Sequence, residues 1–145
     1  MTKLPQFSLA FFHPRYWLSW TGIAALWCIV QLPYPLLLRI GHGLGRLAMR
    51  LLPRRVDIAR RNLELCFPDM KKAEREHLLQ RNFESVGMGV IETGMAWFWP
   101  DWRVRKCFSV SGYEHMEEAR ARGNGVVLIG MHFLTLELGA RIFGM

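Results

Sequence analysis

Cysteine is scarce in this 145-residue chain, which contains only Cys28, Cys66 and Cys107. No two of them form a CxxC pair, and no cysteine and histidine share the spacing that a zinc site needs, so the sequence predicts no metal site. An odd number of widely separated cysteines also argues against a disulfide framework. We therefore expect three reduced thiols packed against other side chains.

Acidic residues are also few, with 12 Asp and Glu against 19 Lys and Arg, which gives a formal net charge of +7. This balance favours an anionic partner, whether nucleic acid, a phospholipid surface or an acidic protein. Hydrophobic residues make up 51% of the chain and include six tryptophans. That content excludes a disordered chain and requires burial in a core or a membrane.

Charged side chains are absent from residues 16–38, which read YWLSWTGIAALWCIVQLPYPLLL. An apolar helix of this length can cross a hydrocarbon core of about 30 Å, and tryptophan and tyrosine near its ends are typical of a lipid interface. No small-residue cleavage site follows, which excludes a signal peptide. We predict a membrane anchor. Pro33 and Pro35 would end the helix near Leu32, which leaves an interfacial helix or a buried helix as alternatives to a full crossing.

Between residues 39 and 61 the only acidic side chain is Asp57, whereas arginine is frequent. Arginine beside a membrane segment marks the cytoplasmic side and binds anionic headgroups. A solvated helix face or a nucleic-acid surface are the alternatives, but no aromatic residues are interleaved for base stacking. We predict an anionic lipid surface and no nucleic-acid binding. The seven arginines are Arg39, Arg46, Arg50, Arg54, Arg55, Arg60 and Arg61.

The middle of the chain has helical periodicity. Apolar residues spaced by three and four open a helix at Val56 that ends at Pro68, and a second helix follows, with Asp69 as its N-cap and Pro100 at its end. The second helix contains Gly87, Gly89 and Gly94, which lower helix stability by about 1 kcal/mol each relative to alanine. They indicate close packing of another helix, or of a lipid tail, against the backbone. Its Met and aromatic residues indicate core, with an acyl-chain pocket as the alternative: Met88, Met95, Trp97, Phe98 and Trp99.

Beyond Asp101 the pattern changes to that of an α/β fold. CFSVSG alternates as a short strand does, YEHMEEARA is a polar helix, RGNG is a tight turn, and VVLIGM is typical of a buried parallel strand. Together they predict a β-α-β unit. Ligands of open α/β sheets bind beyond the carboxyl ends of the strands. His132 comes directly after the second predicted strand and is therefore a candidate site residue.

His132 and Glu137 are the polar pair of this segment. Residues five apart in one helix lie about 140° apart around its axis, so the two side chains cannot meet if both are within the helix. If His132 lies in the turn and Glu137 in the first turns of the helix, the carboxylate can fix the imidazole tautomer. The free nitrogen can then accept a proton from a bound hydroxyl, which favours acyl transfer. The alternative is an incidental polar pair at the mouth of a core helix, because HxxxxE pairs occur by chance in many chains. The remaining histidines have no paired spacing and no assigned role: His13, His42, His77 and His115.

Five longer segments are spread over essentially the whole chain: HPRYWLSW, QLPYP, RRNLELCFPDM, NFESVGMGVIETGMAWFWPD and HFLTLELGAR. They resemble the N-terminal half of the late acyltransferases of lipid A biosynthesis in Gram-negative bacteria. The likeness is greatest to the members that transfer a lauroyl group, and next to those that transfer a palmitoleoyl group. The resemblance implies an inner-membrane enzyme of the Gram-negative cell, active at the cytoplasmic face. It would move a fatty acyl group, lauroyl by the nearest likeness, from acyl carrier protein to a hydroxyacyl chain of the Kdo-bearing lipid IVA precursor.

The HxxxxD/E dyad of that family matches His132 and Glu137, which implies a general base and the carboxylate that orients it. Arg141, four residues further on, is a candidate for binding substrate phosphate, or else a solvent-facing helix residue. The resemblance implies no cofactor. A non-catalytic polybasic membrane module and a phospholipid-pathway acyltransferase with a glycerol-phosphate acceptor are the alternative functions.

The predicted layout has four parts. Residues 1–15 form a short basic segment, 16–38 a transmembrane or interfacial anchor, 39–101 a basic helical region, and 102–145 the start of a glycerolipid-acyltransferase-like α/β domain. The family continues for about as long again, so we expect a truncated chain that is inactive by itself, because a β-α-β unit alone leaves sheet edges and an apolar face uncovered.

Overall fold

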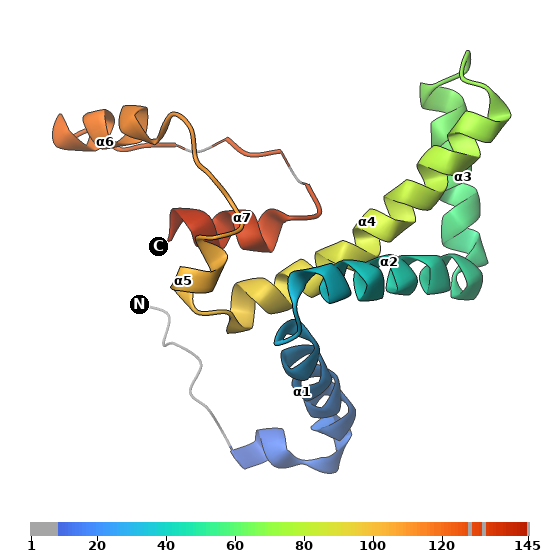
Figure 1. Ribbon diagram of the computed structural model, residues 1–145, viewed down its shortest axis with the longest axis horizontal. Coiled ribbons are helices and arrows are strands. Elements are labelled where there is room, and N and C mark those ends of the chain that lie inside the picture. The colour runs from blue at the N-terminus through green and yellow to red at the C-terminus, as the bar shows by residue number, and fades with distance from the viewer. Residues whose placement is uncertain (1–8, 128, 132, 145) are drawn as a thin grey trace.

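The computed structural model describes residues 9–127, 129–131 and 133–144, and it is helical (Figure 1). Two short 3-10 helices, η1 (Leu9–Phe12) and η2 (Pro14–Tyr16), precede α1. The α-helices are α1 (Trp17–Val30), α2 (Tyr34–Leu51), α3 (Pro53–Cys66), α4 (Lys72–Phe98), α5 (Asp101–Val104), α6 (Tyr113–Ala121) and α7 (Leu136–Phe143). The long helix α4 is the centre of the arrangement, with α2 beside it and α1 extending away from the pair (Figure 1).

The apolar run 16–38 is divided between two helices, so the prediction of an N-terminal membrane helix over this run was wrong. Helix α1 ends at Val30 after 14 residues, and Pro33 then becomes the N-cap of α2. Fourteen residues rise about 21 Å, short of the roughly 30 Å of a hydrocarbon core. Pro35 occupies the first turn of α2, where a missing backbone N–H costs nothing. Within the described part of the chain, no helix combines the length and apolar character needed to span a bilayer.

Helices α2 and α4 touch through their backbones at three glycines. A Cβ atom on Gly87 of α4 would overlap the carbonyl oxygen of Gly41 and the backbone of Gly45, and one on Gly45 would overlap the backbone of Phe83. Gly94 is close to α1 instead, where an added Cβ would lie 2.8 Å from side-chain carbons of Leu26. The predicted close packing against the glycines of α4 is thus confirmed, and the element packed there is another helix.

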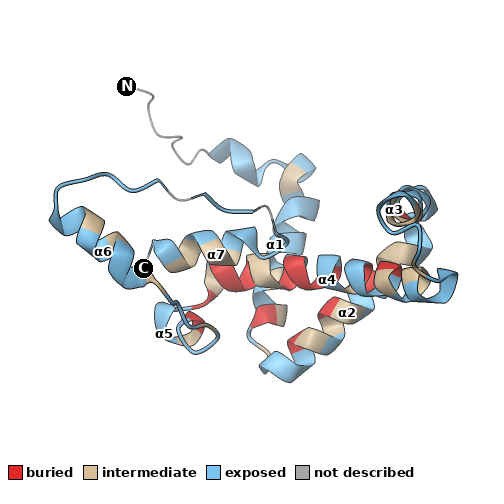
Figure 2. Ribbon diagram, turned by 90° about the horizontal axis from the view of Figure 1, so that it is seen from above, coloured by how far each residue is buried: buried red, intermediate tan, exposed pale blue. Residues whose placement is uncertain are grey.

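The main core lies where α1, α2, α4 and α5 meet, and its buried residues follow one side of α4 (Figure 2). The prediction of core residues is confirmed for Met88, Met95 and Trp99, whereas Trp97 is exposed. The indole Nε1 of Trp99 donates a hydrogen bond of 2.6 Å to the Val30 carbonyl at the end of α1. The Arg103 guanidinium lies 3.8 Å from the centre of the same ring and donates to the Leu32 carbonyl. These contacts join the α4–α5 corner to the end of α1.

A smaller core joins α3 to the first half of α4, with Val56, Leu79 and Phe83 at its centre. The predicted end of α3 before Pro68 is confirmed. The predicted N-cap of the next helix at Asp69 was wrong, because a turn in which the Met70 N–H donates to the Phe67 carbonyl delays the start of α4 to Lys72.

The predicted α/β fold of residues 102–145 was wrong. Only the intervening helix is found, as α6, and neither CFSVSG nor the described part of VVLIGM is a strand. A strand needs a second segment to take up its backbone hydrogen bonds. Outside the helices, the backbone bonds among the described residues connect near neighbours in sequence, so no such partner lies alongside. Val127 and Ile129 are instead 87% and 96% exposed.

Candidate active site at the start of α7

Glu137 lies in the first turn of α7, which meets one of the two conditions for contact with His132 that the sequence set. A carboxylate there interacts favourably with the positive end of the helix dipole. The side chain is exposed and therefore accessible to a ligand. His132, the other member of the predicted pair, lies outside the described residues. Of the pair, the described residues include only Glu137, which lies on a helix that begins four positions after residue 132 in the sequence.

Arg141 holds α7 against the rest of the protein. Its guanidinium donates to the backbone carbonyl of Ala96 near the end of α4, and forms an ion pair of 2.8 Å with the Asp101 carboxylate at the start of α5. The Arg141 side chain is mostly buried, whereas Asp101 is largely exposed. Because these partners already occupy the guanidinium, the predicted phosphate-binding role of Arg141 would need it to leave one of them. Its observed contacts position the helix that carries Glu137.

A second contact fixes the chain just before α7. The backbone of Leu134 packs against Gly89 of α4, where an added Cβ would lie 3.4 Å from the Leu134 oxygen. On α7 itself, Leu138 and Ile142 pack against the main core. Contacts with α4 thus hold α7 near both of its ends, at Leu134 just before the helix and at Arg141 in its last turn.

An apolar hollow of about 630 Å³ lies between α7 and the segment before it. This volume falls within the usual range of small-molecule sites, roughly 300–1,000 Å³. All of its described walls come from residues 130–143, and they include Leu136 but not Glu137. The lining residues are Gly130, Met131, Phe133, Thr135, Leu136, Gly139, Ala140 and Phe143.

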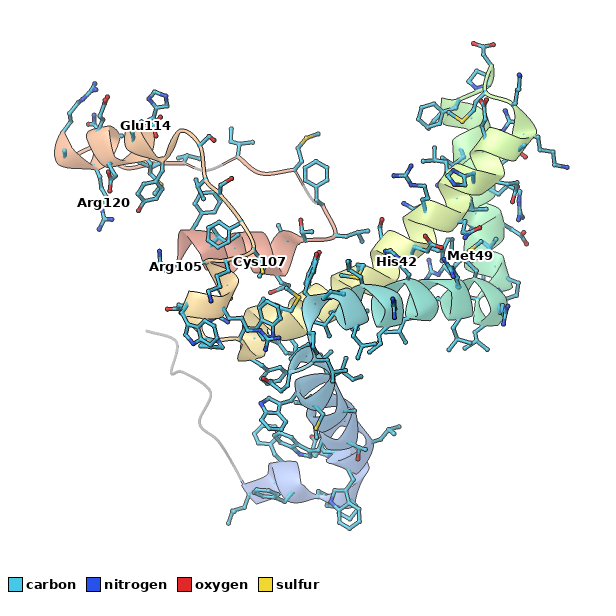
Figure 3. The ribbon with its side chains drawn as sticks, viewed as in Figure 1. His42, Met49, Arg105, Cys107, Glu114 and Arg120 are labelled. Atoms are coloured by element: carbon cyan, nitrogen blue, oxygen red, sulfur yellow. The ribbon has the colours of Figure 1, made fainter. Side chains whose placement is uncertain are left out.

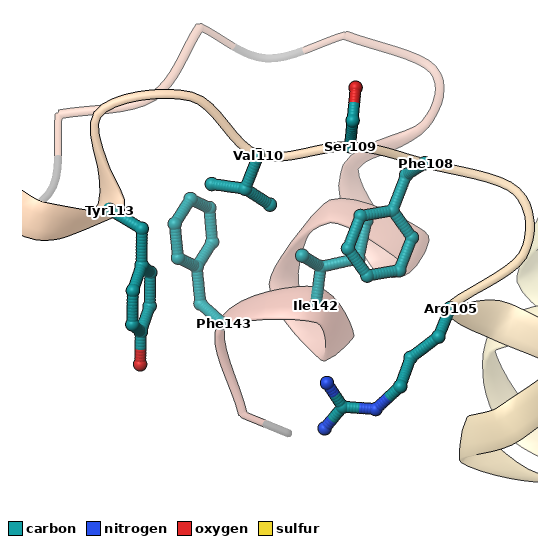
Figure 4. Close-up of a pocket in the computed structure, with 7 residues that line it drawn as sticks. All are labelled: Arg105, Phe108, Ser109, Val110, Tyr113, Ile142 and Phe143. Atoms are coloured by element: carbon teal, nitrogen blue, oxygen red, sulfur yellow. The ribbon is translucent and has the colours of Figure 1, made fainter.

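A second hollow of about 370 Å³ is also lined by Phe143 (Figure 4). Its walls include the aromatic rings of Phe108, Tyr113 and Phe143 and the side chains of Val110 and Ile142. The Arg105 guanidinium lies at one end. The ring of Tyr113 stands at the opposite end (Figure 4). Figure 3 also shows Arg105 beside α7, where it lines this hollow with Ile142 and Phe143. The two hollows are therefore neighbours that share Phe143 as a lining residue.

Burial raises the pKa of two ionisable groups on α2 and α4 that sequence reasoning missed. Burial raises the pKa of the Glu92 carboxyl, for which no hydrogen bond or ion pair is found among the described residues. Burial, and then the charges of Glu92 and Cys107, raise the pKa of Tyr34. No sequence signal identifies Glu92, because its neighbours on α4 follow the ordinary helical pattern.

The seven predicted lipid-binding arginines divide into two groups. Three are engaged by carboxylates: Arg46 with Glu84 at 2.7 Å, Arg60 with Asp57 and Glu76, and Arg61 with Glu64. Within residues 9–127, 129–131 and 133–144, no ion pair or hydrogen bond is found for the side chains of the other four, Arg39, Arg50, Arg54 and Arg55. These four are the arginines available to an external anion.

Cys28, Cys66 and Cys107 are free thiols, as predicted, but all three are exposed, so the expectation that they would be packed was wrong. In the part of the chain that the structure describes, no group of three or more His, Cys, Asp or Glu side chains could hold a metal ion. Sequence reasoning also missed Asp101 and Ala96 as the partners of Arg141, since their contact spans 40 and 45 positions.

Comparisons with known proteins agree with the sequence resemblance. A family model described as bacterial lipid A biosynthesis acyltransferase matches residues 4–145. The lipid A biosynthesis lauroyltransferase of Escherichia coli K12 is 59% identical over 145 residues, covering 100% of this chain and 47% of that enzyme. The palmitoleoyltransferase of the same organism is 52% identical over 97% of this chain and 46% of its own length.

A more distant relative, the Escherichia coli myristoyltransferase of lipid A biosynthesis, is 31% identical over 96% of this chain and 43% of its own length. No solved structure gives a significant match. The chain spans about half the length of the curated relatives it matches. With a family model matching nearly every residue, the chain belongs to the bacterial lipid A biosynthesis acyltransferases.

Proposed function

We propose that this chain is the N-terminal part of an acyltransferase that moves a lauroyl group from acyl carrier protein to a hydroxyacyl chain of the Kdo-bearing lipid IVA precursor. The observation that carries the proposal is the 59% identity with a lauroyltransferase over the whole chain. The palmitoleoyltransferase is less similar, at 52%, which favours lauroyl as the donor chain.

His132 is the proposed general base, and Glu137 is its orienting carboxylate. The imidazole accepts the proton of the acceptor hydroxyl while the hydroxyl oxygen attacks the carbonyl carbon of the thioester. A C–O ester bond forms and the C–S bond breaks. The departing thiolate then takes the proton from the imidazolium. Glu137 accepts a hydrogen bond from the other ring nitrogen and stabilises the imidazolium in the transition state. Its place in the first turn of α7 supports this role.

The apolar hollow beside α7 supports a lipid-chain substrate. Its lining is dominated by aliphatic, aromatic and glycine residues, with Thr135 as its only side chain bearing a hydroxyl. Such a surface offers a hydrocarbon chain burial worth about 25 cal/mol per Å² and offers a polar ligand few partners. We assign the hollow to the acyl chain that enters beside the reacting carbonyl.

The proposed location is the cytoplasmic face of the Gram-negative inner membrane. All three proposed partners are anionic: the acidic acyl carrier protein, the lipid precursor with its phosphates and sugar carboxylates, and the membrane surface. The net charge of +7 and the four unpaired arginines suit such partners. The same arginines also favour a second candidate, a non-catalytic module that holds anionic lipid without using the dyad.

Acyl transfer by a chimera would test the catalytic proposal. Residues 1–145 would be joined to the remaining half of the Escherichia coli lauroyltransferase and supplied with lauroyl-acyl carrier protein and Kdo-lipid IVA. We expect transfer to fall about 10²–10⁴-fold with His132→Ala, the usual contribution of general acid–base catalysis, and less with Glu137→Gln. Vesicle binding should not change.

The control is His77→Ala, which replaces an exposed histidine on α4 and should leave transfer intact. Full activity of the His132→Ala chimera would remove the dyad assignment. An inactive parent chimera that still binds vesicles would favour the non-catalytic module. For the 145-residue chain alone we expect no transfer, because residues 126–131, next to the proposed base, expose their described apolar side chains instead of packing them.

A further inference from the structure

Helix α2 has an exposed apolar row next to the face that makes its glycine contact with α4. Leu36, Leu44, Leu47 and Leu51 are between 39% and 68% exposed, whereas Leu37, Gly41 and Gly45 are buried. At 3.6 residues per turn the four exposed leucines fall within an arc of about 80°. Figure 3 shows side chains projecting from α2 into open space along the edge from which α1 also extends. The row is therefore a real face of the folded protein.

The charges of α2 lie along one flank of this row. Arg39 and Arg50 are 11 residues apart, which places them within about 20° of each other, and both lie about 60° from the line through Leu36 and Leu47. Neither has an ion pair or hydrogen bond of its side chain within the described residues. Helix α2 contains no acidic residue at all. A leucine row with free arginines beside it is the pattern of a helix that lies in a membrane interface.

We propose that α2 lies flat in the interface of an anionic membrane, with its leucine row among the acyl chains and Arg39 and Arg50 on lipid phosphates. This inference rests on the membrane location proposed above and names the surface responsible. Arg46, between them in sequence, is engaged by Glu84 and holds α2 to α4 instead. The structure thus separates membrane-facing arginines from structural ones within a single helix.

Two other occupants of this face fit less well. A second copy of the chain, docked by the same face, would bring only positive charges of α2 against each other. A protein partner would be expected to meet aromatic or methionine side chains, which are enriched at protein interfaces, but the row consists only of leucine. Lipid acyl chains need apolar area without specific shape, which leucines supply.

Fluorescent probes at single cysteines would test the proposal directly. Because the three native cysteines are exposed and free, a background with Cys28→Ser, Cys66→Ser and Cys107→Ser should fold normally. An environment-sensitive probe would be placed at Leu47→Cys or Leu51→Cys, with Leu65→Cys on α3 as the exposed control. With vesicles containing phosphatidylglycerol, emission at 47 and 51 should rise and shift to the blue, while the control stays unchanged.

Charge variants give a second, independent measurement. Arg39→Gln/Arg50→Gln should weaken binding to phosphatidylglycerol vesicles about 30-fold, from about 1 kcal/mol per arginine at the surface. The matched control, Arg81→Gln/Arg120→Gln, removes the same net charge from α4 and α6 and should have little effect. Both doubles should bind pure phosphatidylcholine equally.

The outcomes separate this proposal from the membrane location itself. Vesicle binding with probes 47 and 51 still in water would overturn the α2 proposal and leave the location standing. Loss of all vesicle binding in the parent chain would overturn both. Probes that are already shielded without vesicles would also overturn it, and would indicate a protein occupant for this face.

Discussion

The α2–α4 pair and the C-terminal residues 105–144 both contain apolar runs, yet they differ in packing. In the pair, backbones touch at Gly41, Gly45 and Gly87, and the cores on either side are buried. Helices α6 and α7 contain no buried residue, and the segment between them exposes its described valine and isoleucine side chains. The difference shows that an apolar run packs only where a complementary surface is folded beside it. The candidate site lies in the less packed region.

The largest expected effect comes from separating α2 from α4. Gly87→Leu adds a side chain where a Cβ already overlaps the backbone of α2, so the helices must move apart. We expect a loss of about 3 kcal/mol in the free energy of unfolding, at the upper end of overpacking effects. Urea denaturation followed by circular dichroism measures it.

Gly43→Ala is the matched control for this substitution. Nothing lies within 4 Å of a Cβ at position 43, so replacing that glycine in the same helix pair should stabilise the chain by up to about 1 kcal/mol. A Gly87→Leu chain as stable as the parent would show that the backbone contact is not what holds the pair.

The next effect concerns the docking of α7. Arg141→Met removes the bond to the Ala96 carbonyl and the ion pair with Asp101. Because Asp101 is largely exposed, that pair contributes little, and most of the loss comes from the mostly buried carbonyl bond, about 1.5 kcal/mol in all. We expect amides of residues 136–143 to exchange roughly ten times faster, with α2 and α4 unchanged.

Arg122→Met provides the comparison for Arg141→Met. It breaks an exposed pair with Glu118 on α6 and should leave the exchange of α7 at the parent rate. If Arg141→Met has no more effect on α7 than this control, then α7 is held by its apolar contacts alone.

The smallest effect compares two carboxylates of α4. Burial raises the pKa of Glu92, so its ionised form destabilises the fold, and this cost develops as pH rises from the unfolded value near 4.5 through the folded pKa. Glu92→Gln should therefore stabilise the chain at pH 7, with the gain vanishing in acid. Unfolding free energies at several pH values measure it.

Glu84 should show the opposite sign. Hydrogen bonds from Gln80 and Arg46 lower its pKa, so its contribution to stability is present at neutral pH and is lost as pH falls below 4.5 toward the folded pKa. Glu84→Gln should destabilise the chain at pH 7 and not in acid. If both substitutions change the free energy of unfolding at pH 7 in the same direction, then the loss of a charge alone determines that change, and local packing against α2 does not.

The helical part of the fold was largely predictable from local patterns. Pro68 and Pro100 correctly marked the ends of α3 and α4, and the polar segment YEHMEEARA forms α6. The glycines of α4 correctly indicated close packing, because a residue with a helix-destabilising effect must be offset by tertiary contact.

The wrong predictions share a physical origin. VVLIGM has the composition of a buried strand, but a strand depends on a neighbour distant in sequence, which local pattern does not reveal. The run 16–38 has the composition of a membrane span, yet Pro33 divides it into α1 and α2. The partners of Arg141 were likewise invisible, because its contacts join residues that are far apart in the chain.

The length of helix α4 sets the distance between the two proposed functional surfaces. It meets α2 at Gly87 through a backbone contact, and it meets α7 at Ala96, whose carbonyl accepts a hydrogen bond from the Arg141 side chain. Nine residues of helix rise about 14 Å, so this axial offset is determined by a residue count and not by loop conformation. Inserting or deleting a single residue between the two contacts would also rotate them by about 100° around α4. At its exposed positions, such as Val90, the stretch between Gly87 and Ala96 should therefore tolerate substitution far better than any change of length.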